Sequence, residues 1–165
     1  MNIPNFLTSL RILSAPFLGW FLYKENYFIA VCIFIFSGLT DILDGYIARK
    51  YKLITNFGNI ADPLADKLVQ TTAIFFLVYK QILPLEILLI VLIKELLMGI
   101  GSLFFYKKTN LVVSANWYGK LSTVVFFIAI ILTIFMKIYG IQSLYINLII
   151  VIAVLSTLFA FCMYV

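Results

Sequence analysis

The chain has 165 residues, of which 64% are hydrophobic and 12% are charged, and its mean hydropathy is +1.12. Soluble domains are roughly half apolar, so this composition excludes an ordinary soluble protein and indicates an integral membrane protein. The formal net charge of +5 suits a surface of anionic lipid, and no nucleic-acid partner is needed to explain it.

Apolar runs divide the chain into six membrane-spanning helices when each is allowed about 20 residues. The first run is short, so we expect it to draw on the amphipathic stretch MNIPNFLTSLR, which lies in the membrane interface. That stretch lacks the features of a secretory signal, so we expect it to stay on the mature protein. A single all-α membrane domain over residues 1–165 follows. The spans are expected near 12–23, 27–48, 60–79, 82–106, 118–138 and 142–164.

Basic residues are distributed unequally between the two sides of these spans, which predicts the orientation in the cell membrane. The poorer side carries Lys24, Lys80 and Lys137. The richer side is expected to be cytoplasmic and to hold both termini and the segment between the second and third spans. It carries Arg11, Arg49, Lys50, Lys52, Lys67, Lys107, Lys108 and Lys120.

Four of the seven acidic residues lie between positions 41 and 66. Asp41 and Asp44 are three apart, and Asp62 and Asp66 are four apart, so each pair shares one face of its helix. Carboxylates aimed at one small volume repel one another unless cations lie between them. The chain has no histidine, and oxygen-only ligands select hard cations such as Mg²⁺, Mn²⁺ or Ca²⁺.

Small residues and an arginine lie between the two pairs of aspartates. Gly45 and Ala48 follow the first pair and Gly58 precedes the second, so they leave helix surface bare where a ligand can approach the backbone. Arg49 presents several donors suited to phosphate oxygens. Together with a carboxylate-bound cation, these residues predict a site for a diphosphate ligand.

Two other interpretations of the aspartates remain open. In a structural one, Asp62 caps a helix whose first turn holds Pro63, and Arg49 anchors the chain at the interface. In a functional one, the carboxylates line the path of a divalent-cation transporter or channel. The second is disfavoured because all four aspartates lie at one membrane face, and only Glu95 and Glu86 continue toward the other.

The complete pattern resembles the signature of the CDP-alcohol phosphatidyltransferase family at every fixed position. It reads Asp41-x2-Asp44-Gly45-x2-Ala48-Arg49-x8-Gly58-x3-Asp62-x3-Asp66. The stretches NIPNFLTSLR, DPLADK and SANWYGKLST are most similar to the phosphatidylglycerophosphate synthases of that family. The resemblance implies a six-helix membrane enzyme, usually a homodimer, that transfers a phosphatidyl group from CDP-diacylglycerol to an alcohol and releases CMP.

The resemblance also implies roles for individual residues. Asp41, Asp44, Asp62 and Asp66 would hold two divalent ions, Mg²⁺ or Mn²⁺, and Asp66 would also serve as the base. The positions that match contacts to CDP-diacylglycerol are Gly45, Ala48, Arg49, Thr55, Gly58, Asn5 and Thr8.

The acceptor side departs from the phosphatidylglycerophosphate synthases. Those proteins generally carry two arginines in span four and a lysine in the next cytoplasmic segment, where this chain has Lys94, Ser102 and Lys120. A lysine binds phosphate as a point charge, so we expect Lys94 and Lys120 to recognise an anionic acceptor. Glycerol 3-phosphate is the leading candidate, and phosphatidylglycerol, giving cardiolipin, is the main alternative. The structural alternative for Lys94 and Glu95 is an internal ion pair with a neighbouring span.

Overall fold

The computed structural model describes the backbone of residues 3–51, 56–109 and 117–163, and the side chains of these residues except 3, 4, 49, 56–60, 102–109, 118 and 120. It contains six helices within those ranges, which confirms the all-α prediction. They are α1 (Ile3–Tyr23), α2 (Tyr27–Lys50), α3 (Asn56–Tyr79), α4 (Leu85–Thr109), α5 (Trp117–Ile138) and α6 (Ser143–Cys162).

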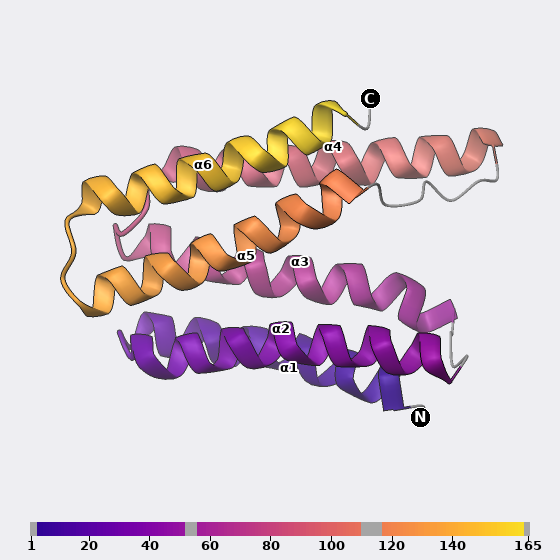
Figure 1. The fold of residues 1–165 in the computed structure, drawn as a ribbon, viewed down its shortest axis with the longest axis horizontal. Coiled ribbons are helices and arrows are strands. Elements are labelled where there is room, and N and C mark those ends of the chain that lie inside the picture. The colour runs from indigo at the N-terminus through magenta and orange to yellow at the C-terminus, as the bar shows by residue number, and fades with distance from the viewer. Residues whose placement is uncertain (1–2, 52–55, 110–116, 164–165) are drawn as a thin grey trace.

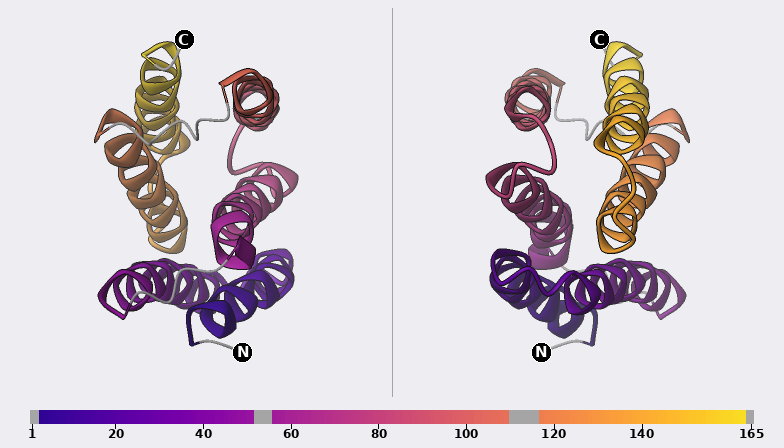
Figure 2. Two further views of the ribbon diagram at one scale, coloured as in Figure 1. Left: turned by 90° about the vertical axis from the view of Figure 1, so that its right-hand side faces the viewer. Right: turned by 90° about the vertical axis from the view of Figure 1, so that its left-hand side faces the viewer.

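The helices run along one common direction and alternate in sense, so α1 starts and α6 finishes at the same end of the bundle (Figure 1). Viewed along the helices, α1 and α2 form a base from which α3 and α4 rise on one side and α5 and α6 on the other (Figure 2). In the described ranges, α1, α2, α5 and α6 are long and apolar enough to cross a membrane, as in a multi-pass membrane protein. Six spans remain a prediction.

One part of the core lies where α1 packs against α2 and α3. Leu18 and Leu22 of α1 and Ile74 and Leu77 of α3 are completely buried. Gly19 permits this close packing, because a Cβ at that position would lie 2.5 Å from the Phe76 ring of α3. Burial of these side chains holds α1 against α3, the helix that carries the second pair of aspartates.

Two helix starts differ from the sequence-based prediction. Helix α1 is continuous from Ile3 to Tyr23 and passes through Pro16, so the N-terminal amphipathic stretch and the first span form one helix. Helix α3 begins at Asn56, four residues before the predicted start, so Asp62 lies inside it. Asp62 is therefore not the cap of this helix, and the structural interpretation of that residue is wrong.

The opposite end of the bundle is held by an ion pair between two turns. Lys80, after α3, lies 2.8 Å from Glu25, in the turn that joins α1 to α2. The sequence predicts that Lys80 lies near the outer interface, and the pair places it with Glu25 at the end of the bundle away from the aspartates.

Candidate active site

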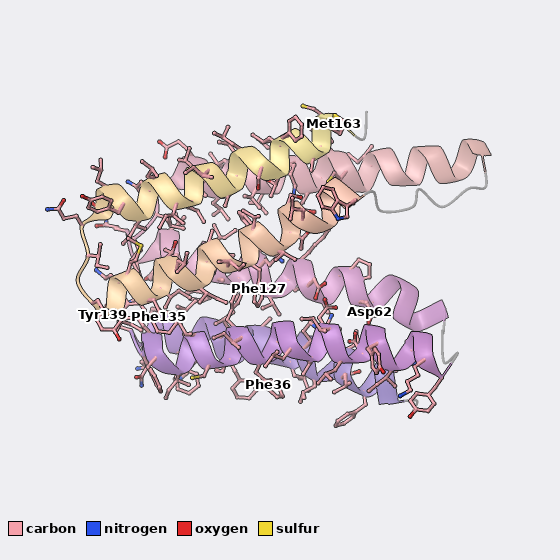
Figure 3. All side chains as sticks on the ribbon, viewed as in Figure 1. Phe36, Asp62, Phe127, Phe135, Tyr139 and Met163 are labelled. Atoms are coloured by element: carbon pink, nitrogen blue, oxygen red, sulfur yellow. The ribbon has the colours of Figure 1, made fainter. Side chains whose placement is uncertain are left out.

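Two residues of α1 contact all four aspartates of the predicted site. The Thr8 hydroxyl donates a hydrogen bond of 2.5 Å to Asp62 Oδ1. One turn later, the Arg11 guanidinium contacts Asp41, Asp44 and Asp66. The sequence predicts that the two pairs of carboxylates face one small volume, and in the structure both pairs lie beside the same face of α1. Figure 3 shows Asp62 where α3 faces the pair formed by α1 and α2.

Arg11 is the site residue that the sequence analysis missed, because it was counted only as a charge that sets orientation. Its Nη1 lies 2.8 Å from Asp41 Oδ1 and 2.8 Å from Asp66 Oδ1, and its Nη2 pairs with Asp44 Oδ2. Its side chain is 1% exposed. A usable signal was present, since Arg11 follows Thr8 by three residues and so shares its helix face.

An open cavity of about 420 Å³ adjoins the carboxylates and is lined by α3, α4, α5 and α6. Asp62 and Asp66 line one wall, and Lys94 and Glu95 of α4 line another. Ser122 and Thr123 of α5 and Thr157 of α6 add hydroxyl groups to the lining. The predicted base and one predicted acceptor-binding lysine therefore face a common space.

Charged residues of α3 and α4 form a network at this cavity. The Glu95 carboxylate lies 2.6 Å from Nζ of Lys94 and 2.6 Å from Nζ of Lys67. The internal ion pair between spans, which the sequence analysis kept as an alternative, is present. It does not remove Lys94 from the site, because two lysines share one carboxylate and the group retains a net positive charge.

A second cavity, of about 210 Å³, lies on the other side of Asp66 between α2, α3 and α5. Asp41 and Asp66 line it together with apolar residues such as Ile35, Leu39 and Phe127. Asp66 thus borders both a cavity lined in part by lysines and one whose lining includes no lysine. This arrangement suits a reaction between a polar molecule and a lipid.

The remaining predicted donor contacts are only partly described. Gly45 and Ala48 are partly buried on α2 beyond Asp44, and Asn5 lies one turn before Thr8 on α1. Thr55 lies outside the described residues. For Arg49, Gly58, Ser102 and Lys120 the structure describes the helix backbone and not the side chain.

The chemistry of the carboxylates fits a hard divalent cation. Four carboxylates and one guanidinium carry a formal charge of −3, and oxygen atoms from Asp41, Asp44 and Asp66 converge on a single cationic group. Among the described residues, no three acidic or thiol side chains already surround one point suited to a metal ion. Arg11 lies among the carboxylates instead.

Comparison with known proteins gives the same assignment as the signature. Residues 1–159 match the CDP-alcohol phosphatidyltransferase family. The chain is 30% identical over 147 residues to the CDP-diacylglycerol--glycerol-3-phosphate 3-phosphatidyltransferase of Aquifex aeolicus, an alignment that covers 87% of this chain and 82% of that protein.

Cardiolipin synthases are also similar. The chain is 34% identical over 111 residues to the human cardiolipin synthase (CMP-forming), covering 67% of this chain. It is 36% identical over 97 residues, or 59% of this chain, to a Schizosaccharomyces pombe cardiolipin synthase (CMP-forming) / mitochondrial hydrolase fusion protein. These alignments span 36% and 16% of the lengths of the two proteins. From its match over nearly its whole length, this chain belongs to the CDP-alcohol phosphatidyltransferase family.

Proposed function

We propose that this protein transfers the phosphatidyl group of CDP-diacylglycerol to glycerol 3-phosphate and releases CMP, in a reaction that depends on a divalent cation. The observation that carries the proposal is the cavity in which Asp62 and Asp66 face Lys94. A proton-accepting carboxylate and a cationic group for a phosphorylated alcohol share one space there. The similarity to the Aquifex protein, whose name includes both substrates, supports the same reaction.

The cation would be Mg²⁺ or Mn²⁺, bound as two ions by Asp41, Asp44, Asp62 and Asp66. When bound, such ions would stabilise the negative charge that develops on the leaving CMP. The small residues Gly45 and Ala48 leave room on α2 for the cytidine part of the donor. Arg49, Thr55, Gly58, Asn5 and Thr8 are assigned to the same donor by the signature.

Asp66 acts as the base in this proposal. Its Oδ1 bonds to Arg11, so Oδ2 is the oxygen assigned to accept the proton of the acceptor hydroxyl. The hydroxyl oxygen then forms a bond to the phosphorus that carries the diacylglycerol group. The bond between that phosphorus and the oxygen shared with CMP breaks, and the electron pair leaves with CMP. With no histidine in the chain, direct displacement is favoured over a phosphohistidine intermediate.

Lys94 binds the acceptor phosphate, and Lys120 is assigned to the same task from α5. Glu95 holds Lys94 in place and offsets part of the positive charge that Lys94 and Lys67 bring to the cavity. Lysine is a flexible point charge, so this pocket selects for charge more than for the planar geometry that a pair of arginines recognises.

Phosphatidylglycerol is the second candidate acceptor, and the similarity to the human cardiolipin synthase favours it. Its phosphate is also anionic, so Lys94 serves either acceptor. The two acceptors differ in their apolar parts, because phosphatidylglycerol needs room for acyl chains beside the cavity. In both cases we propose a homodimer with its site at the cytoplasmic face, where the basic residues are concentrated.

Measurement of CMP release by the purified, reconstituted protein tests this proposal. CDP-diacylglycerol is supplied with glycerol 3-phosphate, phosphatidylglycerol, inositol 1-phosphate or serine, each with and without Mn²⁺. We expect metal-dependent CMP release with glycerol 3-phosphate and little with serine, a zwitterion that has no phosphate. Release with phosphatidylglycerol alone would shift the assignment to cardiolipin synthesis, whereas Mn²⁺ flux across the vesicle membrane without CMP release would favour a transporter.

A further inference from the structure

Arg11 is the largest completely buried side chain in the described part of the chain, and it carries a charge. It reaches from α1 to carboxylates on both α2 and α3. A buried guanidinium is costly unless its donors are paired, and here Nε has no described partner. Apolar packing alone would be served better by leucine, so the charge itself must be what this position requires.

The three carboxylates around Arg11 differ in exposure. The side chain of Asp44 is 3% exposed, whereas those of Asp41 and Asp66 are 42% and 32% exposed. Asp44 therefore has almost no access to water and relies on Arg11 for a counter-charge. Asp41 and Asp66 border the two cavities and are open to a further cation from that side.

Arg11 and a bound cation would neutralise the same negative charges. No three described acidic side chains surround a vacant point, because the guanidinium lies where three of them converge. Two positive groups that share one set of carboxylates repel each other, so each weakens the binding of the other. This coupling distinguishes Arg11 from a residue that only packs against the site.

We propose that Arg11 is a positioning residue that serves as the built-in counter-ion of the carboxylate cluster. When no metal is bound, Arg11 holds the aspartates of α2 and α3 together. It also lowers the affinity of the aspartates for the metal, so that bound ions can exchange. The inference rests on the proposed metal-dependent function and adds a role that the family signature does not include, since position 11 lies outside it.

Thermal unfolding in nonionic detergent tests the inference without measuring activity. Wild type and Arg11→Met are compared in chelator and across a Mn²⁺ titration. In chelator we expect the Tm of Arg11→Met to lie about 5 °C or more below that of wild type, because a buried ion pair has been broken. The rise in Tm at saturating Mn²⁺ should be larger in the variant, and its half-saturating Mn²⁺ concentration should be several-fold lower.

Two matched controls separate charge from packing. Leu18→Ala removes a completely buried side chain two turns along α1, so it should lower Tm and leave the Mn²⁺-induced rise unchanged. Lys80→Met removes a cation from a carboxylate at the other end of the bundle and should also leave that rise unchanged. Adding Asp44→Asn to Arg11→Met should recover part of the lost Tm in chelator, because the buried carboxylate no longer needs a counter-ion.

Arg11→Lys keeps one charge without the fork of donors, so its Tm in chelator and its Mn²⁺ response should lie between those of wild type and Arg11→Met. If Arg11→Met does not fold, the Mn²⁺ titration of Arg11→Lys is compared with that of wild type instead. An equal Mn²⁺-induced rise in wild type and both variants, or loss of that rise in the variants, would overturn the counter-ion role and leave the proposed function standing. No Mn²⁺ response in wild type would overturn both.

Discussion

Thr8 and Asp62 lie 54 positions apart in the chain, and the Thr8 hydroxyl donates a 2.5 Å hydrogen bond to the Asp62 carboxylate between α1 and α3. Thr8 is buried, so water cannot easily replace the hydroxyl. The N-terminal stretch thus contacts the carboxylate cluster, and its assignment to donor binding stays a prediction.

Replacement of this hydroxyl gives the first prediction. Thr8→Val keeps the shape of the side chain and removes the donor, which should cost about 1.5–3 kcal/mol of interaction with the charged carboxylate. We expect kcat/KM for CDP-diacylglycerol to fall roughly tenfold or more. Thr8→Ser retains the donor and should keep most of the activity. Full activity in Thr8→Val would show that the hydrogen bond does not matter, whereas a loss confined to Thr8→Ser would assign the effect to the methyl group.

Lys94 gives the second prediction, which concerns the acceptor. Lys94→Ala should raise KM for glycerol 3-phosphate by roughly 10-fold to 100-fold, the effect of losing a charged hydrogen bond to phosphate. Release of CMP at saturating acceptor should change much less. Lys80→Ala removes a lysine far from the cavity and serves as the control. An unchanged KM in Lys94→Ala would contradict the assignment of this residue to the acceptor phosphate.

Gly38 gives the third prediction, which concerns the packing between α2 and α5. A Cβ at Gly38 would lie 2.4 Å from the ring of Phe127, which is stacked on buried Phe34 at a centroid distance of 4.4 Å. Figure 3 labels Phe127 where α5 faces α2. The ring has little freedom to withdraw, so Gly38→Ala should destabilise the protein by about 1–3 kcal/mol.

A second helical glycine provides the control for this substitution. A Cβ at Gly101 meets no described atom within 4 Å, so Gly101→Ala should leave stability unchanged or raise it slightly. Thermal unfolding of both variants measures the difference. If both alanine variants unfold at the wild-type temperature, the contact between α2 and α5 does not prevent a larger residue at position 38.

The ion pair between Glu25 and Lys80 gives a prediction about pH. The hydrogen bond from Lys80 lowers the pKa of Glu25, so the stability it contributes is present above the ordinary value of 4.5 and is lost as pH falls through the lowered pKa. The same hydrogen bond raises the pKa of Lys80, so its contribution is present below 10.5 and is lost as pH rises through the raised pKa.

Glu25→Gln should therefore lower Tm slightly between these limits and have no effect at a pH below the pKa of Glu25. The effect is small because the pair is exposed to solvent, and added salt should reduce it further. Measurement of Tm against pH at two salt concentrations tests this expectation. A difference from wild type that persists unchanged at low pH would assign the effect to packing of the side chain.

Much of the fold is predictable because hydropathy reports on each helix separately. Six apolar runs correspond to six helices, and the spacing of Asp41, Asp44, Asp62 and Asp66 is enough to place each pair on one face. The starts of α1 and α3 are less predictable. The N-terminal halves of α1 and α3 contain polar residues that pair with each other, such as Thr8 with Asp62 and Arg11 with Asp66. Hydropathy does not detect such contacts between helices.

The rest of the site depends on contacts between helices that are distant in sequence. Arg11 joins carboxylates from α2 and α3, and Lys67 of α3 meets Glu95 of α4. Nothing local to position 11 or position 67 specifies those partners, because they follow from how the helices pack. The cavity that brings Asp66 and Lys94 together has the same origin, since residues from four helices line it.

In the proposed function, the four aspartates bind the divalent cation on which phosphatidyl transfer depends. The most direct measurement is CMP release from CDP-diacylglycerol and glycerol 3-phosphate by chelated wild type and by Asp41→Asn, Asp44→Asn, Asp62→Asn and Asp66→Asn, before and after addition of Mg²⁺ or Mn²⁺. We predict that the metal restores wild type and that each variant stays inactive while remaining inserted in the membrane. Substantial metal-independent release by wild type, or retention of activity in all four variants, would contradict the account.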